Sequence, residues 1–353
     1  MTWLLDHASN AIRYRALVDV ARVTGDLSRE ITNLVYAHPP ALMLSLSQSP
    51  DGVWNGSMLE IPSARSERFE RVGTISAFRR LVEYGWDKDS PPLHRARRPL
   101  FRLLAEDNDP AYLFELATRG EDDGDMPRRG RAILREAAAA ALAQAGYEED
   151  PRLRGAAGRI LGRIDRFLRS PLAHRPWVRV GNKQVLATEV APPSIYALSM
   201  LAHMPIFRLE HHVELDRLYH YISQPLPRQD VVQVFGTRLV EQPHLVLGDM
   251  LSNRNVADAD VPFAIAWLEL MARLGFLRRN EGWSKLFERF LDDRDRDRVW
   301  HPHKGMAVPR STNPYVWPAF PLEQMTSGDE RWTDVTFRLG LIARLSGRPI
   351  ELV

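Results

Sequence analysis

The stretch Gln48-Ser49-Pro50-Asp51-Gly52-Val53-Trp54 indicates the fold of this chain, and the apolar run 41–46 comes just before it. Asp-Gly dipeptides favour tight turns because glycine accepts a positive φ. Tryptophan brings a large apolar ring with one N–H that needs an acceptor, and glutamine can both donate and accept hydrogen bonds. The stretch therefore predicts a turn after a helix, with Trp54 buried and Gln48 bonded to backbone near a helix end.

Apolar residues recur at helical spacing through most of the remaining chain. The spacing predicts helices over residues 72–84, 91–104, 133–145, 153–168, 195–204, 209–222, 231–251 with a break at Pro243, 262–274, 283–291 and 333–345. Glycine followed by an aromatic residue ends three of these helices, at Gly85, Gly146 and Gly275. Glycine is common just past a helix end, so the chain is predicted to repeat a helix pair of roughly 60 to 65 residues.

Three motifs together resemble bacterial proteins of the terpenoid cyclase/prenyltransferase superfamily that carry squalene-cyclase (QW) repeats. They are the opening Arg13-Tyr14-Arg15-Ala16-Leu17, the turn that ends at Trp54, and Gly146-Tyr147-Glu148-Glu149-Asp150-Pro151-Arg152. The similarity is strongest over residues 1–170. It implies an all-α fold, an α/α toroid of about five to seven helix pairs, in a single domain over residues 1–353. A second, degenerate copy of the turn is expected at Asp295-Arg296-Asp297-Arg298-Val299-Trp300, which lacks the glutamine and the glycine.

Composition excludes several classes of protein. The chain has 353 residues, 44% of them apolar, and no cysteine, so disulfides, thiolate metal ligands and cysteine nucleophiles are excluded. The sequence has no recognisable signal peptide and no long apolar span. We therefore expect a cytoplasmic protein without a transmembrane segment. Arginines alternate with acids, so no nucleic-acid partner is expected. Dinucleotide and P-loop motifs are missing, so no cofactor is expected; the oligomeric state and peripheral membrane contact stay open.

Candidate catalytic acids lie before the predicted helix at 262–274. Class II terpenoid cyclases, which the resemblance suggests, protonate an alkene with the middle acid of a D-x-D-D motif. The stretch Asp258-Ala259-Asp260-Val261 has the first two acids of this motif but lacks the last. A carboxyl group buried among apolar groups has a raised pKa and can donate a proton. The alternative is that Asp260 caps the helix, with Pro262 in its first turn.

Aromatic residues concentrate in the second half of the chain and supply candidate ligand-binding residues. The segment 313–323 is too rich in proline for a helix and is predicted to be a loop over the mouth of the toroid. The predicted ligand-binding set is Tyr315, Trp317, Phe320, Trp267 and Asp334. Aromatic walls suit isoprenoids or carbocations and equally suit sugars. The alternative is that these rings pack the loop onto the helices.

One histidine cluster is a candidate metal site. His212, Asp216 and His220 lie four residues apart and share one helix face, so they could hold zinc or iron. Residues i and i+8 rarely reach one ion, and a solvent-facing polar stripe explains the spacing equally well. We expect no tight metal site here.

Three functions are consistent with these observations. The first is a toroid that binds or transforms an isoprenoid-like or other apolar ligand by acid-initiated chemistry, as a cyclase-type isomerase or lyase. The second is a non-catalytic helical interaction scaffold. The third is a carbohydrate-active toroid, which needs two suitably spaced carboxylates that sequence spacing does not identify.

Overall fold

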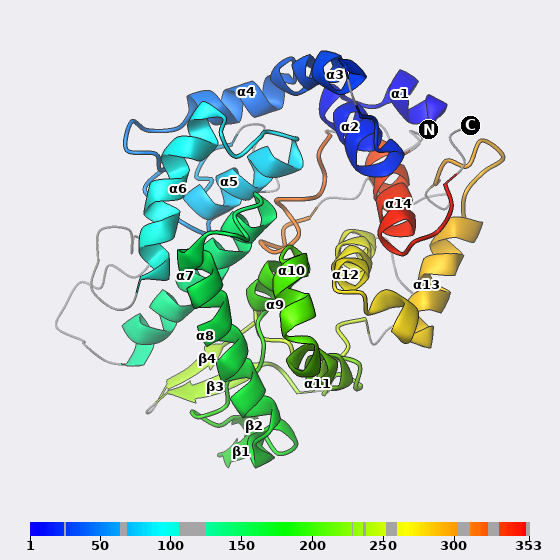
Figure 1. Ribbon diagram of the computed structural model, residues 1–353. Coiled ribbons are helices and arrows are strands. Elements are labelled where there is room, and N and C mark those ends of the chain that lie inside the picture. Colours follow the sequence, from blue (N-terminus) through cyan, green and yellow to red (C-terminus); the bar gives the residue numbers. More distant parts are fainter. Residues whose placement is uncertain are drawn as a thin grey trace. The chain divides into compact units, whose positions relative to one another are not determined.

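The computed structural model describes residues 1–24, 26–63, 69–105, 125–227, 229–235, 238–251, 260–301, 311–323 and 332–350 (Figure 1). The chain divides into two compact units. Unit 1 comprises Met1–Arg98 with Asn253–Val353, and unit 2 comprises Pro99–Ser252. The prediction of one domain over the whole chain stays a prediction.

Unit 1 is built from helices that come from both ends of the chain. In chain order they are α1 (Thr2–His7), α2 (Asn10–Arg15), a π-helical turn η1 (Ala16–Ala21), α3 (Asp26–Tyr36), α4 (Pro39–Leu46), α5 (Thr74–Glu83), the first part of α6 (Pro91–Leu104), α12 (Val261–Arg273), a 3₁₀ turn η6 (Leu277–Arg279), α13 (Glu281–Asp292) and α14 (Thr333–Leu345). The C-terminal helix α14 packs against α12, η1, α1 and α2, so the two ends of the chain share one core.

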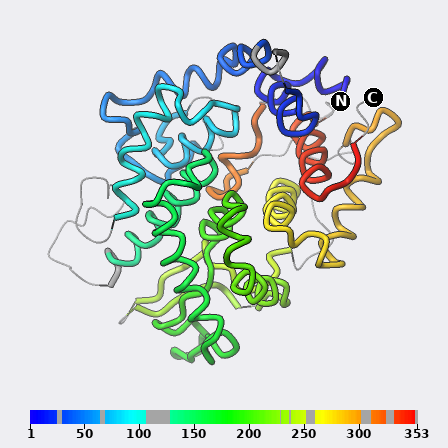
Figure 2. The backbone as a smooth tube through the Cα atoms, in the orientation of Figure 1, coloured from blue at the N-terminus to red at the C-terminus, as the bar shows by residue number. Residues whose placement is uncertain are grey.

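Unit 2 combines helices with a small sheet. It contains α7 (Asp125–Gln144), α8 (Pro151–Leu168), a 3₁₀ turn η4 (Pro171–Ala173), β1 (Trp177–Val180), β2 (Lys183–Leu186), α9 (Ile195–Ala202), α10 (Pro205–Glu210), α11 (His212–Ile222), β3 (Val232–Phe235) and β4 (Arg238–Glu241). The sheet order is β1-β2-β3-β4, with antiparallel outer pairs and one parallel pair in the middle. Figure 2 follows the backbone through the two hairpins. The core of the unit lies between α7 and α9, where the alanine run 137–141 is fully buried and lets the two helices approach closely.

The predicted all-α toroid is wrong, because unit 2 contains a four-stranded mixed sheet. The segment 231–251 was expected to be helical but contributes β3 and β4. In β3, half-buried residues alternate with buried ones over Val232-Gln233-Val234-Phe235. Four residues are too few to separate this alternation from a helical pattern. The hairpin of β1 and β2 lies between two predicted helices in a stretch where no strand was expected.

The predicted glycine stops are confirmed. At Gly85, where φ is 92°, the amide of Trp86 donates to the carbonyl of Leu81 and the amide of Gly85 donates to that of Val82. This pair of bonds is the Schellman arrangement, which needs a left-handed residue and so favours glycine. The same pairs of bonds close α7 at Gly146 and α12 at Gly275.

The turn that ends at Trp54 has the predicted structure. Trp54 is fully buried, and its indole N–H donates to the carbonyl of Leu44 in α4 at 2.8 Å. The Gln48 amide donates to the carbonyls of Gly52 and Pro92 at 3.1 and 2.9 Å, so it links the turn to the first residues of α6. Trp54 and Gln48 therefore fasten α4, the turn and α6 together.

The predicted second copy of this turn is also present in unit 1. Asp295 donates its amide N–H to the carbonyl of Val299, as Ser49 does to Val53, each over a four-residue separation. The backbone N–H of Trp54 donates to the Thr74 hydroxyl at 3.0 Å. The backbone N–H of Trp300 donates to the Thr336 hydroxyl at 3.1 Å. The structure therefore repeats the turn between α13 and α14, although the glutamine is missing there.

No helix within the described ranges is long and apolar enough to cross a membrane.

Candidate functional site

Of the two predicted catalytic acids, the structure describes only Asp260. Asp258 lies outside the described residues. Asp260 is the residue before α12; it is exposed, and its side chain makes no capping hydrogen bond. Asp260 is nevertheless the N-cap residue of α12, with Pro262 in the first turn, so the alternative interpretation of its position is confirmed. The apolar burial that would make this carboxyl a proton donor is missing.

Trp267 is a core residue of unit 1. It lies in the middle of α12, is 1% exposed, and packs edge-on against Trp283 of α13 with ring centroids 6.2 Å apart. Phe263, one turn earlier, stacks on it at 6.4 Å. The ring is thus enclosed by its neighbours and packs α12 against α13.

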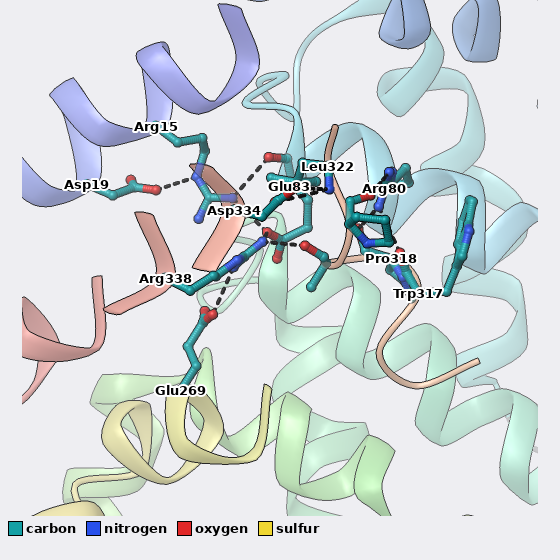
Figure 3. Close-up of polar contacts among 12 residues, drawn as sticks. Arg15, Asp19, Arg80, Glu83, Glu269, Trp317, Pro318, Leu322, Asp334 and Arg338 are labelled. Carbon is teal, nitrogen blue, oxygen red and sulfur yellow. Dashed lines mark hydrogen bonds and ion pairs between the residues drawn. The ribbon is translucent and has the colours of Figure 1, made fainter. Parts of the chain in front are cut away.

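The predicted aromatic loop is held down by an arginine of α5. Arg80 is buried; it donates to the carbonyls of Trp317 and Pro318 at 2.8 and 3.5 Å, and also to the carbonyl of Pro321. Its guanidinium group also lies 5.0 Å from the centre of the Trp317 ring. Figure 3 shows Arg80 pointing at the backbone of this loop. Arg80 therefore binds the loop carbonyls that would otherwise be free to face a ligand.

The three aromatic residues of the loop differ in their surroundings. Phe320 is 2% exposed and Trp317 is 9% exposed. The Trp317 ring packs nearly perpendicular to that of Phe69, with ring centroids 6.3 Å apart. Tyr315 is half-buried, and burial raises the pKa of its phenol to about 12. Two of the three rings pack into unit 1, as the packing alternative predicted.

Asp334 fastens the end of the same loop. It lies in the first turn of α14 and is 1% exposed. The amide of Leu322 donates to both carboxyl oxygens at 3.1 and 3.0 Å, and the amide of Glu323 donates to one of them at 3.1 Å. The acid that was predicted to bind a ligand instead binds backbone of its own chain.

The pKa of Asp334 is raised to about 7. Burial is the largest cause, and the neighbouring Glu323 carboxylate adds to it. The amide donors at Leu322 and Glu323 and the guanidinium of Arg338 act in the opposite direction. A carboxyl group with this pKa changes charge in the neutral range, although its oxygens face the loop backbone.

A buried cluster of charges lies beside Asp334 in unit 1, and sequence analysis missed it. Glu83 accepts hydrogen bonds from Arg15 at 2.7 Å and from Arg338 at 2.6 Å. Arg338 also donates to Glu269 at 2.8 Å and to the carbonyl of Ala319 at 2.7 Å. Figure 3 shows these side chains converging from α2, α5, α12 and α14.

Two further charged groups complete the cluster. Arg15 pairs with Asp19 one turn along, and Arg273 pairs with Glu269 at 2.9 Å. The cluster thus contains the cations Arg15, Arg273 and Arg338 and the anions Asp19, Glu83 and Glu269, so its formal charges balance.

The electrostatics of the cluster follow from this pairing. Burial alone would raise the pKa of Glu83, but Arg338 and Arg15 reverse that effect and hold the pKa well below its usual range. Burial also opposes ionisation of Glu269, whose pKa is nevertheless lowered, mainly by Arg338 and Arg273. Both carboxylates are therefore ionised at neutral pH and have no proton to give to a substrate.

A local sequence signal for this cluster does exist. Glu83 and Glu269 are the single acids of α5 and α12 and both are buried, and Arg15 belongs to the opening motif quoted above. A lone charge on a buried face requires a partner. The partner is not visible in the sequence, because Arg338 lies 255 residues from Glu83.

The histidine cluster lies on the exposed side of α11. His212, Asp216 and His220 are all exposed, and His220 lies 3.4 Å from the Asp216 carboxylate. No group of three or more metal-ligating side chains gathers anywhere in the described parts of the chain. The pair of Asp216 and His220 is an ordinary surface contact one turn apart.

One open surface depression of unit 1 has a volume of about 560 Å³. It is lined by Asp89, Pro91, His94 and Arg95 at the start of α6 and contains none of the residues predicted for a site. Its lining has no aromatic wall and no buried acid, which the apolar-ligand hypothesis requires.

No protein-family model, no curated protein and no solved structure matches this chain. The resemblance to squalene-cyclase repeats therefore stays a hypothesis about the motifs and supplies no site residues.

Proposed function

We propose that this chain is a non-catalytic, mostly helical interaction protein. One observation carries the proposal: the groups of unit 1 that could do chemistry are engaged with one another. Glu83 and Glu269 pair with arginines, Asp334 accepts amide donors of its own loop, and Arg80 binds loop carbonyls. Groups already paired inside a folded core cannot bind a substrate without first breaking those bonds.

Exposed apolar side chains on α4 support the proposal from outside the core. Helix α4 has no charged residue between Pro39 and Leu46. Its Leu42, Met43 and Leu46 are 38%, 48% and 83% exposed, while Ala41 and Leu44 of the same helix are buried. A short helix with apolar residues on both its inner and outer sides is typical of a surface that a partner covers.

A similar feature occurs in unit 2, on α10 and the start of α11. Ile206, Leu209 and Val213 are 48%, 78% and 48% exposed at spacings of three and four residues. Residues at these spacings lie on one side of a continuous helix, although here the helix is interrupted at His211. Each unit thus offers an apolar surface for binding.

The proposal is tested by reciprocal co-purification from the source cell with stoichiometric recovery of a named partner. Replacing Leu42 and Leu46 by glutamate should abolish recovery while leaving the melting temperature unchanged. A matched control is Leu239→Glu on β4, where the leucine is 42% exposed. Its recovery should equal that of the wild-type chain.

A second measurement tests the non-catalytic part. Cell metabolites are incubated with the wild-type chain or with Asp334→Asn and compared by mass spectrometry. The two samples should be identical. A metabolite that the wild-type chain consumes and Asp334→Asn leaves intact would make the protein an enzyme and overturn the proposal.

A further inference from the structure

The β1–β2 hairpin of unit 2 is an exposed, positively charged surface. From Arg166 to Thr188 the chain contains no Asp or Glu. The cations in this interval are Arg166, Arg169, Arg175, Arg179 and Lys183. The last three of these are exposed, and no acidic side chain among the described residues pairs with them. The hairpin therefore combines positive charge with the free edge of a sheet.

Strand β1 is the terminal strand of the sheet, so one of its edges pairs with no other strand in the described part of the chain. Residues that face each other across the hairpin include Trp177 with Leu186 and Val180 with Lys183. The neighbouring residues Pro176 and Ala187 also face each other, and the amide of Ala187 donates to the carbonyl of Pro176 at 3.0 Å. Residues 176, 178 and 180 therefore direct their backbone groups towards β2, because bonded and non-bonded pairs alternate in an antiparallel ladder.

The alternation leaves the backbone groups of Trp177 and Arg179 pointing outward. Their N–H and C=O groups lie on the free edge, with the spacing that an added strand would use. The Arg179 side chain stays close to the hairpin, since its Nε donates to the carbonyl of Gly181 at 3.1 Å. The edge thus offers donors and acceptors for one more strand.

The side chains of β1 separate charge from apolar surface. Trp177 and Arg179 lie on one face, and Val178 and Val180 on the other, each valine 39% exposed. Arg175 lies two residues before Trp177, in phase with the arginine face. A strand added at this edge would place every second side chain beside arginine and the intervening ones beside valine.

We propose that the free edge of β1 binds an extended, acidic segment of a partner protein as a fifth strand, with carboxylates alternating with apolar side chains. The proposal rests on the proposed function, for which it names one partner chemistry. A second copy of this chain fits less well, because antiparallel pairing of β1 with itself would place the arginines of both copies on one face of the sheet with no carboxylate between them. Nucleic acid fits less well too, because the outward carbonyls and the valines offer nothing to phosphate.

The probe is a fluorescein-labelled octapeptide of alternating glutamate and valine, and binding is followed by fluorescence anisotropy. The control peptide has the same composition in two blocks, which keeps the charge and removes the alternation. The alternating peptide should bind and the block peptide should bind at least about tenfold more weakly. Equal binding of the two peptides would overturn the proposal.

Two further comparisons separate an edge strand from general charge attraction. Arg179→Glu should raise the dissociation constant at least about tenfold. The matched control Arg166→Glu, on the exposed face of α8, should change it less than about threefold. Two further peptides carry N-methyl groups on alternate amides, one on the even-numbered and one on the odd-numbered residues. One of them should lose binding and the other should keep it, because only every second amide of an added strand faces β1. Equal effects of both arginine variants, or of both methylation phases, would overturn the inference.

The two failures are distinguishable. If no peptide binds but stoichiometric co-purification succeeds and depends on Leu42 and Leu46, the hairpin inference falls and the proposed function stands. If a single-stranded oligonucleotide binds more tightly than the alternating peptide, and loses binding in Arg179→Glu, the hairpin is a nucleic-acid surface and the inference is again wrong.

Discussion

Replacing Glu83 by glutamine tests whether the buried charge cluster organises unit 1. The substitution keeps the size of the side chain and removes one negative charge from a site where Glu83 is only 5% exposed. Two guanidinium groups lose a charged acceptor, Arg15 at 2.7 Å and Arg338 at 2.6 Å. Breaking a buried ion pair by removing one partner costs about 3–5 kcal/mol, because the remaining charge is uncompensated.

The remaining partners place the cost at the lower end of this range. Arg15 keeps Asp19, and Arg338 keeps Glu269 and the carbonyl of Ala319. We therefore expect Glu83→Gln to lower the free energy of unfolding by about 3 kcal/mol. For a unit of this size that corresponds to a melting temperature lower by roughly 6–12 °C.

Urea denaturation followed by circular dichroism measures the loss, and two controls make it specific. Glu60→Gln removes an acid that pairs with the exposed Arg71, and its cost should be no more than about 1 kcal/mol. The double variant Glu83→Gln/Arg338→Met removes both charges, so the two changes should couple by about 1–3 kcal/mol. If Glu83→Gln costs no more than Glu60→Gln, the cluster does not organise the unit and the reasoning is refuted.

Three further predictions concern Asp334, the two turns and the histidine cluster. The pKa of Asp334 is about 7 in the folded chain against an ordinary 3.8, so its stability contribution is complete below pH 4 and is lost as the pH rises through 7. Between pH 5 and 8 the free energy of unfolding should therefore fall relative to that of Asp334→Asn by on the order of 2–3 kcal/mol, because the rest of the loss occurs below pH 5. Parallel curves would contradict this. Trp54→Ala and Trp300→Ala should each lower the free energy of unfolding by about 3–5 kcal/mol, since both rings are buried. An unchanged melting temperature for either variant would contradict the prediction that its ring stabilises the core. Elemental analysis of untagged protein should find no stoichiometric zinc or iron, and metal that disappears when His212 and His220 are replaced would reverse that view.

The parts of the fold that the sequence predicted correctly are those determined by neighbouring residues. The turn that ends at Trp54 depends on a dipeptide, a ring and an amide within seven residues. The glycine stops depend on one residue that adopts a left-handed conformation. Even the second turn, at Trp300, was recognisable without its glutamine and glycine, because Asp297 and Trp300 keep the spacing of Asp51 and Trp54.

The sheet and the charge cluster depend on distant residues, and for that reason the sequence did not reveal them. Each strand has four residues, too few for an alternating pattern to differ from a helical one. The central parallel pair joins Leu186 to Gln233, which are 47 residues apart along the chain. Asp334 was predicted to bind a ligand, and in the structure its carboxylate accepts the backbone N–H of Leu322, a contact that the sequence does not reveal.

Buried charge in unit 1 specifies an arrangement more than it adds stability. Well-packed apolar residues often stabilise a core as well as paired ions do, so the cluster requires another explanation. Arg338 joins Glu83, Glu269 and the loop carbonyl of Ala319, which are contributed by three separate segments of the chain. A competing arrangement of these helices would leave at least one buried charge unpaired, and that penalty selects against it. A core specified in this way holds its surface helices in fixed positions, which is the property that an interaction protein needs.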